Sequence, residues 1–282
     1  MGANTKISWT DHSWNPAWGC SKVSPGCDHC YAEALDRRTG GDHWGPGKPR
    51  RRTSEKNWNE PRRWNRQAEK TGVRPKVFCA SMADVFDNEW PPEWRADLWK
   101  LIRETPNLDW LLLTKRIGNV IAMLPDDWED GWPHVWIGAT VVNQEEADRD
   151  VPKLRAIPAA VHFLSIEPML GRVNISPWLE DNFWVIVGGE SGPGARPMHP
   201  DWARTLRDQC AAADVPFFFK QWGAWVPNET SPYRMIVYRD GAVDLPDGRG
   251  ADEEAGEVFM AHWGKKRAGA LLDGREHKEF PT

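Results

Sequence analysis

The segment KVFCASMAD, residues 76–84, is a short apolar run rich in β-branched and aromatic residues that ends in polar groups. Runs of the same kind recur down the chain, separated by stretches with helical spacing. Strands of nearly continuous hydrophobicity that alternate with helices favour a parallel sheet with helices outside it. The predicted strands are Lys76–Ser81, Trp110–Thr114, Val135–Thr140, Val161–Ile166, Trp184–Val187 and Pro216–Lys220, with a short one before Cys20.

The stretches between these runs predict the helices Glu93–Glu104, Gly118–Met123, Glu145–Ile157 and Pro200–Ala213, and a further helix is predicted over Gly256–Leu272. The pattern indicates an α/β fold, a partial (β/α) barrel of about six to seven parallel strands. A doubly wound open sheet shows the same rhythm and stays an alternative. We expect residues 1–225 to form the barrel domain, with a basic insertion over 34–75, and 226–282 to form a C-terminal extension packed on it.

The composition is that of an ordinary water-soluble protein. Of 282 residues, 40% are hydrophobic and 27% are charged. No apolar stretch approaches the roughly 18–20 residues of a membrane span, and the first residues lack the pattern of a signal peptide. We therefore expect a cytoplasmic protein with no membrane partner, and the sequence does not indicate its oligomeric state.

Polar or charged residues follow each predicted strand. In a parallel barrel these carboxyl ends converge on one face, which is where active sites lie. The side chains that this pattern singles out are Ser81, Asp84, Lys115, Thr140, Glu167, Glu190 and Lys220.

The net charge of −5 is unevenly distributed. Residues 37–74 contain twelve Lys and Arg against four Asp and Glu, among them Arg50, Arg51 and Arg52. The same segment contains Trp44, Trp58 and Trp64, and the chain has 19 tryptophans in all. A basic surface with aromatic rings suits phosphate contacts and base stacking. A solvated basic loop is the alternative.

Three of the five cysteines, Cys20, Cys27 and Cys30, lie within eleven residues. Thiolates are soft ligands that suit zinc or iron–sulfur clusters. Gly19 and Pro25-Gly26 allow the tight turns needed to gather three sulfurs. An iron–sulfur cluster, a zinc site completed by His12 or His29, and metal-free thiols all remain open on spacing alone.

The motifs NPAWGC, residues 15–20, and GCDHCYA, residues 26–32, resemble the cluster loop of radical S-adenosylmethionine enzymes, in particular the spore photoproduct lyase-like branch. The first gap has six residues where that superfamily usually has three, and His29 replaces an aromatic residue. Ser81 with Asp84, Thr114-Lys115, and Gly138-Ala-Thr140 resemble further motifs of the branch in the same order. The whole chain also resembles an uncharacterised three-cysteine-motif family of phages and bacteria.

The resemblance implies a [4Fe–4S] cluster on the three cysteines, with S-adenosylmethionine (SAM) bound to the remaining iron and an external electron donor. It implies that Ser81, Asp84, Lys115 and Thr140 hold SAM, with Lys115 facing its carboxylate and Asp84 its amino group or ribose. A buried Lys115–Asp84 ion pair is the structural alternative. The resemblance also suggests that Cys79 returns a hydrogen atom to the product, although a buried core cysteine is the plainer interpretation.

The leading hypothesis is a radical SAM enzyme that repairs or modifies a nucleic-acid base in DNA or RNA. In this hypothesis Glu167, Glu190 and Lys220 contact the substrate, and Arg50, Arg51 and Arg52 contact phosphates. A second hypothesis is a zinc-stabilised nucleic-acid-binding protein without enzymatic activity. A third is a radical SAM enzyme that acts on a peptide or small metabolite.

Overall fold

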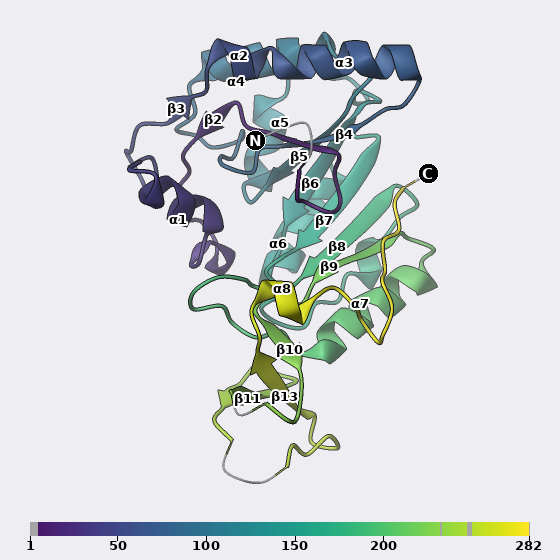
Figure 1. The fold of residues 1–282 in the computed structure, drawn as a ribbon. Helices are drawn as coiled ribbons and strands as arrows, with labels where there is room; N and C mark the ends of the chain where they lie inside the picture. Colours follow the sequence, from purple (N-terminus) through teal and green to yellow (C-terminus); the bar gives the residue numbers. More distant parts are fainter. Residues whose placement is uncertain (1–4, 232, 247–249, 282) are drawn as a thin grey trace. The chain divides into compact units, whose positions relative to one another are not determined.

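The computed structural model describes residues 5–231, 233–246 and 250–281, so the outermost residues of the two predicted domains, 1–4 and 282, lie outside it. The fold is α/β, as predicted. Seven strands form a parallel sheet in the order β1-β4-β5-β6-β7-β8-β9, which is the order of a partial (β/α) barrel (Figure 1). Their bounds are β1 His12–Trp14, β4 Lys76–Cys79, β5 Asp109–Thr114, β6 Val135–Thr140, β7 Val161–Ile166, β8 Phe183–Gly188 and β9 Phe217–Gln221.

All six of the longer predicted strands are present, and their ends differ from the predicted ones by no more than two residues. The predicted helices between them are also present, although the stretch from Gly118 is divided into two short helical turns. Among the described residues, no helix combines the length and apolar character needed to cross a membrane. The helices are α4 Pro92–Arg103, η2 Ile117–Asn119, α5 Val120–Met123, α6 Gln144–Arg155 and α7 Pro200–Ala212, with η3 Ser176–Trp178 before β8.

The chain divides into two compact units, and unit 1 contains the residues up to Ala139 together with Lys153–Phe163. In this unit β4 pairs in parallel with both β1 and β5. Aromatic side chains fill its core. Trp9 packs against Phe78 with ring centroids 4.6 Å apart, and Trp14 contacts the edges of two further tryptophan rings, Trp58 and Trp110.

Half of the segment 34–75 lies in helices. It begins within α1 (Tyr31–Arg38) and continues through β3 (Arg51–Arg52), α2 (Glu55–Trp58) and α3 (Glu60–Thr71), the last two running in nearly the same direction (Figure 1). β3 pairs antiparallel with β2 (Ala17–Trp18). Trp58 and Trp64, which were candidates for base stacking, are instead buried, because α2 and α3 turn their apolar faces inward.

Unit 2 contains Thr140–Pro152 and the chain from Leu164 onward. Its strands β8 and β9 pair in parallel, and the three consecutive phenylalanines of β9 are buried. The last described residues run back along β9, where the Phe219 amide donates to the His277 carbonyl at 2.9 Å.

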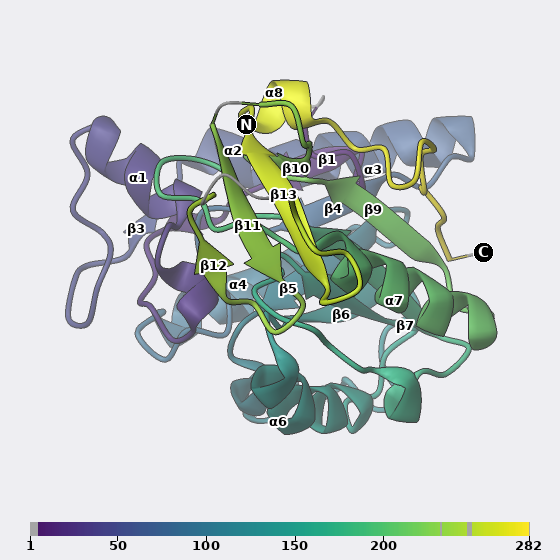
Figure 2. The same cartoon turned by 90° about the horizontal axis from the view of Figure 1, so that it is seen from below.

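The predicted helix over Gly256–Leu272 is wrong. The segment forms β13 (Glu257–His262) followed by one helical turn, α8 (Lys265–Ala268). β13 lies between β10 (Trp225–Pro227) and β11 (Arg234–Tyr238), and β12 (Val243–Asp244) completes an antiparallel sheet (Figure 2). Gly264 and Gly269 lie on either side of α8 with φ near +74°, a backbone conformation that glycine adopts at little cost.

Gly138, on β6, provides a test of the core of unit 1. A β-carbon at this position would lie inside van der Waals distance of the fully buried Phe163 ring. We expect Gly138→Ala to lower the free energy of unfolding by about 1–3 kcal/mol, because a close-packed core tolerates overpacking poorly. Gly118→Ala is the control, since its nearest neighbour would lie at an ordinary 3.9 Å. Urea unfolding of both variants measures the difference, and equal stability would contradict this packing.

Three buried histidines make the stability depend on pH. Burial is the largest cause that lowers the pKa of His134, His199 and His277 from the ordinary value of 6.5. Each therefore contributes stability that is complete above pH 6.5 and is lost as the pH falls through its folded-state pKa. We expect the free energy of unfolding to fall as the pH is lowered below 6.5. Urea titrations at several pH values, combined with NMR titration of the imidazoles, test this; pKa values at or above 6.5 would contradict it.

Candidate functional site

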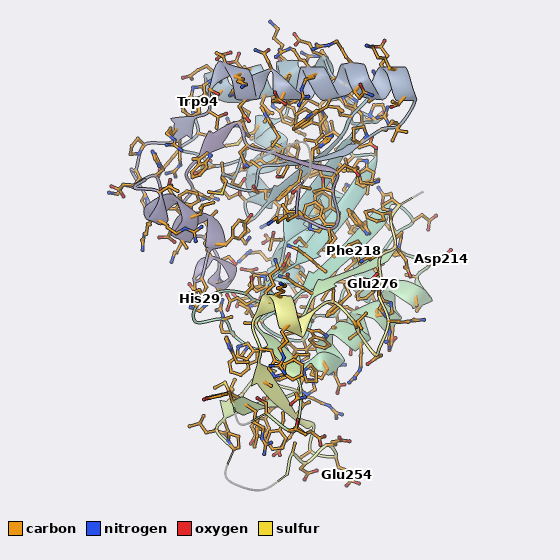
Figure 3. The ribbon with its side chains drawn as sticks, in the orientation of Figure 1. His29, Trp94, Asp214, Phe218, Glu254 and Glu276 are labelled. Carbon is orange, nitrogen blue, oxygen red and sulfur yellow. The ribbon has the colours of Figure 1, made fainter. Side chains whose placement is uncertain are left out.

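The three clustered cysteines lie on one loop of unit 1. Cys20 follows β2, Cys27 ends the 3-10 helix η1 (Pro25–Cys27), and Cys30 is the residue before α1. All three are free thiols of intermediate exposure. Ser24 shapes the turn between them, because its hydroxyl accepts from the Gly26 amide at 3.0 Å and its carbonyl from the Cys27 amide at 2.9 Å. Figure 3 labels His29 on the same loop, and its side chain is exposed.

Arg116 holds the beginning of this loop, and the sequence analysis missed it. Its guanidinium donates to Cys20 Sγ at 3.4 Å and to the Ser21 carbonyl at 2.8 Å. The same group pairs with Asp84 at 3.2 Å, and both side chains are less than a tenth exposed. Lys115 was predicted as a site residue because it belongs to a recognisable motif. No motif includes the neighbouring Arg116, so the sequence did not indicate its role.

Asp84 is the centre of the arrangement. Its carboxylate accepts from the Thr114 hydroxyl at 2.9 Å, from the Phe86 amide at 3.0 Å and from the Lys115 amide at 3.2 Å. It therefore ties the end of β4 to the end of β5. Burial, reinforced by the negative charge of Asp84, raises the pKa of Cys20 to about 12, while Arg116 opposes this shift.

Lys115 does not form the ion pair with Asp84 that was the structural alternative. Only its backbone amide reaches that carboxylate, and its half-buried ammonium has no ion pair or hydrogen bond within the described part of the chain. The Asp84 charge is balanced by Arg116 instead. At the end of β5 there is thus a cation that has no partner among the described residues.

Ser81 is held by Asn15, a residue of the NPAWGC motif to which no separate role was assigned. The Asn15 amide donates to the Ser81 hydroxyl at 2.9 Å, and its carbonyl oxygen accepts from the Met82 amide at 2.7 Å. The Tyr31 hydroxyl donates to the Ser81 carbonyl at 2.9 Å. The turn after β4 is therefore bonded to the loop before Cys20 and to the beginning of α1.

Two further predicted residues are buried. Cys79, on β4, is fully buried, and its burial, together with the charge of Asp84, raises its pKa far above the ordinary range. Thr140, at the end of β6, belongs to unit 2 and is 3% exposed.

The three consecutive arginines have different environments. Arg50 is buried, pairs with Asp87 and Glu89, and donates to three carbonyls of its own segment. Arg51 is exposed and lies over the Trp18 ring. Arg52 stacks on Trp58 at 3.8 Å and pairs with Asp97. Of the three, Arg51 is therefore the one available to an external phosphate.

Unit 2 brings together a second group of polar side chains. The Lys220 ammonium pairs with Glu167 at 2.7 Å, and the Gln221 amide donates to the other Glu167 oxygen at 2.9 Å. Lys265 is close enough to interact with both charges: partial burial and then the Lys220 charge lower its pKa, and Glu167 opposes the shift. Glu190 is separate, since it forms an ion pair with Arg196 at 2.6 Å.

The donor chemistry of the cysteine loop fits an iron–sulfur cluster, because thiolates are the ligands that such clusters take. All three cysteines are of intermediate exposure, and no disulfide joins them. The fit is one of donor type only, because no group of three His, Cys, Asp or Glu side chains in the described ranges is arranged to hold a metal ion.

Asp84→Asn tests the anchor of the loop. Removing the charge leaves the Arg116 guanidinium buried without a full counter-charge, so we expect the free energy of unfolding to fall by about 3 kcal/mol. Asp126→Asn is the matched control, because Asp126 is exposed. Urea unfolding measures both, and a loss no larger than that of the control would contradict the central role of Asp84.

The structure is similar to solved structures of spore photoproduct lyase, and the two described here are each 11% identical to this chain. A mutant of that enzyme aligns with a TM-score of 0.47, covering 93% of this chain and 71% of the other. The enzyme complexed with dinucleoside spore photoproduct aligns with a TM-score of 0.46, covering 92% and 70%. No curated protein matches the sequence. A family model described as a protein of unknown function, DUF5131, matches residues 4–281, and the chain therefore belongs to the DUF5131 family.

Proposed function

We propose that this protein is a radical SAM enzyme that repairs or modifies a nucleic-acid base. One observation carries the proposal: three free thiols lie on a single loop, and buried ionic contacts hold that loop against the ends of β4 and β5. Cys20, Cys27 and Cys30 would hold a [4Fe–4S] cluster with one iron left for SAM. When bound, this pair of cofactors supplies one-electron chemistry that the side chains themselves lack.

The residues around the loop then have distinct roles. Lys115 is our candidate for the SAM carboxylate, since its ammonium has no partner in the described structure. Ser81 is a candidate for binding SAM, with its hydroxyl oriented by Asn15. Asp84 already accepts four hydrogen bonds, so it acts mainly by positioning Arg116 and the loop.

The remaining predicted residues complete the proposal. Cys79 is our candidate hydrogen donor, and its burial protects the thiol from solvent. Thr140 stays a candidate for SAM binding, and Glu167, Glu190 and Lys220 stay candidates for substrate contact. The proposal also requires an external one-electron donor.

Nucleic acid as substrate is supported by the basic segment 37–74, which has an excess of eight positive charges. Within it Arg51, Arg66 and Lys70 are exposed. Such a surface favours phosphates through the release of counterions. Arg50 contributes to the fold of the segment instead, because its guanidinium is fully engaged within the protein.

Anaerobic purification with iron and sulfide analysis tests the proposal. We expect brown protein with about four irons per chain, and loss of the iron and the colour in Cys27→Ala. Cys210→Ala is the matched control, because Cys210 is a buried thiol of α7 with no place in the loop, and it should keep the iron.

A colourless protein that binds one zinc ion through the same cysteines would overturn the radical mechanism and favour the zinc-stabilised binding protein. Iron retained in full by Cys27→Ala would show that the loop is not the ligand set.

A further inference from the structure

Unit 2 contains a pocket of about 430 Å³ that the site described above does not include. It is framed by the loop between β10 and β11 and by the residues that follow β13. Its lining consists of Asn228, Thr230, Ser231, Tyr233, His262, Trp263 and Arg267.

The described lining residues favour a planar, negatively charged ligand. The described lining includes neither a carboxylate nor an aliphatic side chain, so the pocket suits neither a metal cation nor an aliphatic ligand. The Arg267 guanidinium lies 4.3 Å from the centre of the Trp263 ring, which orients a positive charge beside an aromatic face. Tyr233 is 78% exposed, so its ring is accessible for stacking with an external molecule.

The polar edge of the pocket is organised in advance. The Asn228 side-chain oxygen accepts from the Thr230 amide at 3.1 Å and from the Ser231 amide at 2.9 Å. The loop is further joined to β13, because the His262 amide donates to the Tyr233 carbonyl at 3.1 Å. The Thr230 hydroxyl donates to the Asn228 side-chain oxygen and the Ser231 hydroxyl to the Tyr233 carbonyl. Both hydroxyl oxygens can still accept a hydrogen bond from a sugar or a base edge.

We propose that this pocket binds a nucleotide, with the base stacked on Tyr233 and the phosphate paired with Arg267. Base–aromatic stacking tolerates any base, and an arginine adds charge to the contact. Lys266 lies next to Arg267 in sequence and is exposed, which extends the positive charge along a bound nucleic-acid strand. The inference rests on the proposed function where it takes a nucleic-acid strand as the source of the nucleotide; the pocket chemistry is independent of the cluster.

Two pairs of variants test the pocket, with anisotropy of fluorescein-labelled (dT)4, a ligand short enough to occupy one site. We expect Tyr233→Leu to bind about tenfold more weakly, since stacking is lost, and Tyr233→Phe to bind as the unchanged protein does. We expect Arg267→Gln to weaken binding and to lower the slope of log K against log salt by about one. Arg172→Gln, an exposed arginine of unit 2 outside the pocket, should change neither.

Unlabelled thymidine monophosphate, used as a competitor, separates the two sources of ligand. Competition that depends on Tyr233 and Arg267 supports a site for a free nucleotide, and dependence seen with (dT)4 alone supports a strand. Equal binding by Tyr233→Leu and the unchanged protein overturns the inference, as does an equal loss in Arg172→Gln. Binding of maltohexaose in place of either nucleotide overturns it too. Repeating the assay with Cys27→Ala keeps the two proposals apart, because loss of iron should leave this pocket intact.

Discussion

The buried pairing of Asp84 with Arg116 is the contact on which the cysteine loop depends. A carboxylate and a guanidinium that are each less than a tenth exposed are costly to desolvate. The cost is offset only because further hydrogen bonds satisfy both groups, from Thr114 and backbone amides on one side and to Cys20 and Ser21 on the other. Through this one pair the ends of two strands determine where the first thiol lies.

A second buried ionic contact orders the basic segment in the same way. Arg50 pairs with Asp87, three residues after Asp84, and donates to carbonyls on the loop that precedes β3. The turn after β4 therefore supplies carboxylates both to the cysteine loop and to the basic segment. A charge change in that turn is expected to disturb both regions together, and effects of such variants on activity need a parallel measurement of stability.

The candidate sites differ in how many of their hydrogen-bonding and charged groups already have a partner within the protein. Around Asp84 nearly every donor and acceptor has a protein partner, which is typical of a scaffold that holds a ligand in place. Among the residues that the structure describes, Lys115 is left without a partner. In the pocket of unit 2 the exposed Tyr233 ring and the Arg267 guanidinium stand at the surface. Groups of this second kind are the ones from which binding energy for an external molecule can come.

Most of the fold could be predicted from the sequence. The buried strands are continuous apolar runs, and such runs have few structures other than a covered parallel sheet. The close spacing of Cys20, Cys27 and Cys30 likewise marked the loop as a candidate metal site without any structure. The helix predicted over Gly256–Leu272 was wrong. The apolar residues of this segment fit a helix locally, but pairing with β10 and β11, which lie earlier in the sequence, makes its first part a strand.

Only the tertiary structure decided which charged side chains form ion pairs within the protein. In the sequence Arg50 and Arg51 are equivalent, yet one is buried among carboxylates and the other is exposed. Lys115 and Arg116 are adjacent, and only the second pairs with Asp84. Whether a charged side chain is available to a ligand depends on partners that lie tens of residues away in the sequence. The local sequence pattern does not identify these partners. The sequence alone determined the longer strands of the parallel sheet and the thiol cluster; the pairing of charges, the antiparallel sheet that contains β13 and the pocket beside it came from the fold.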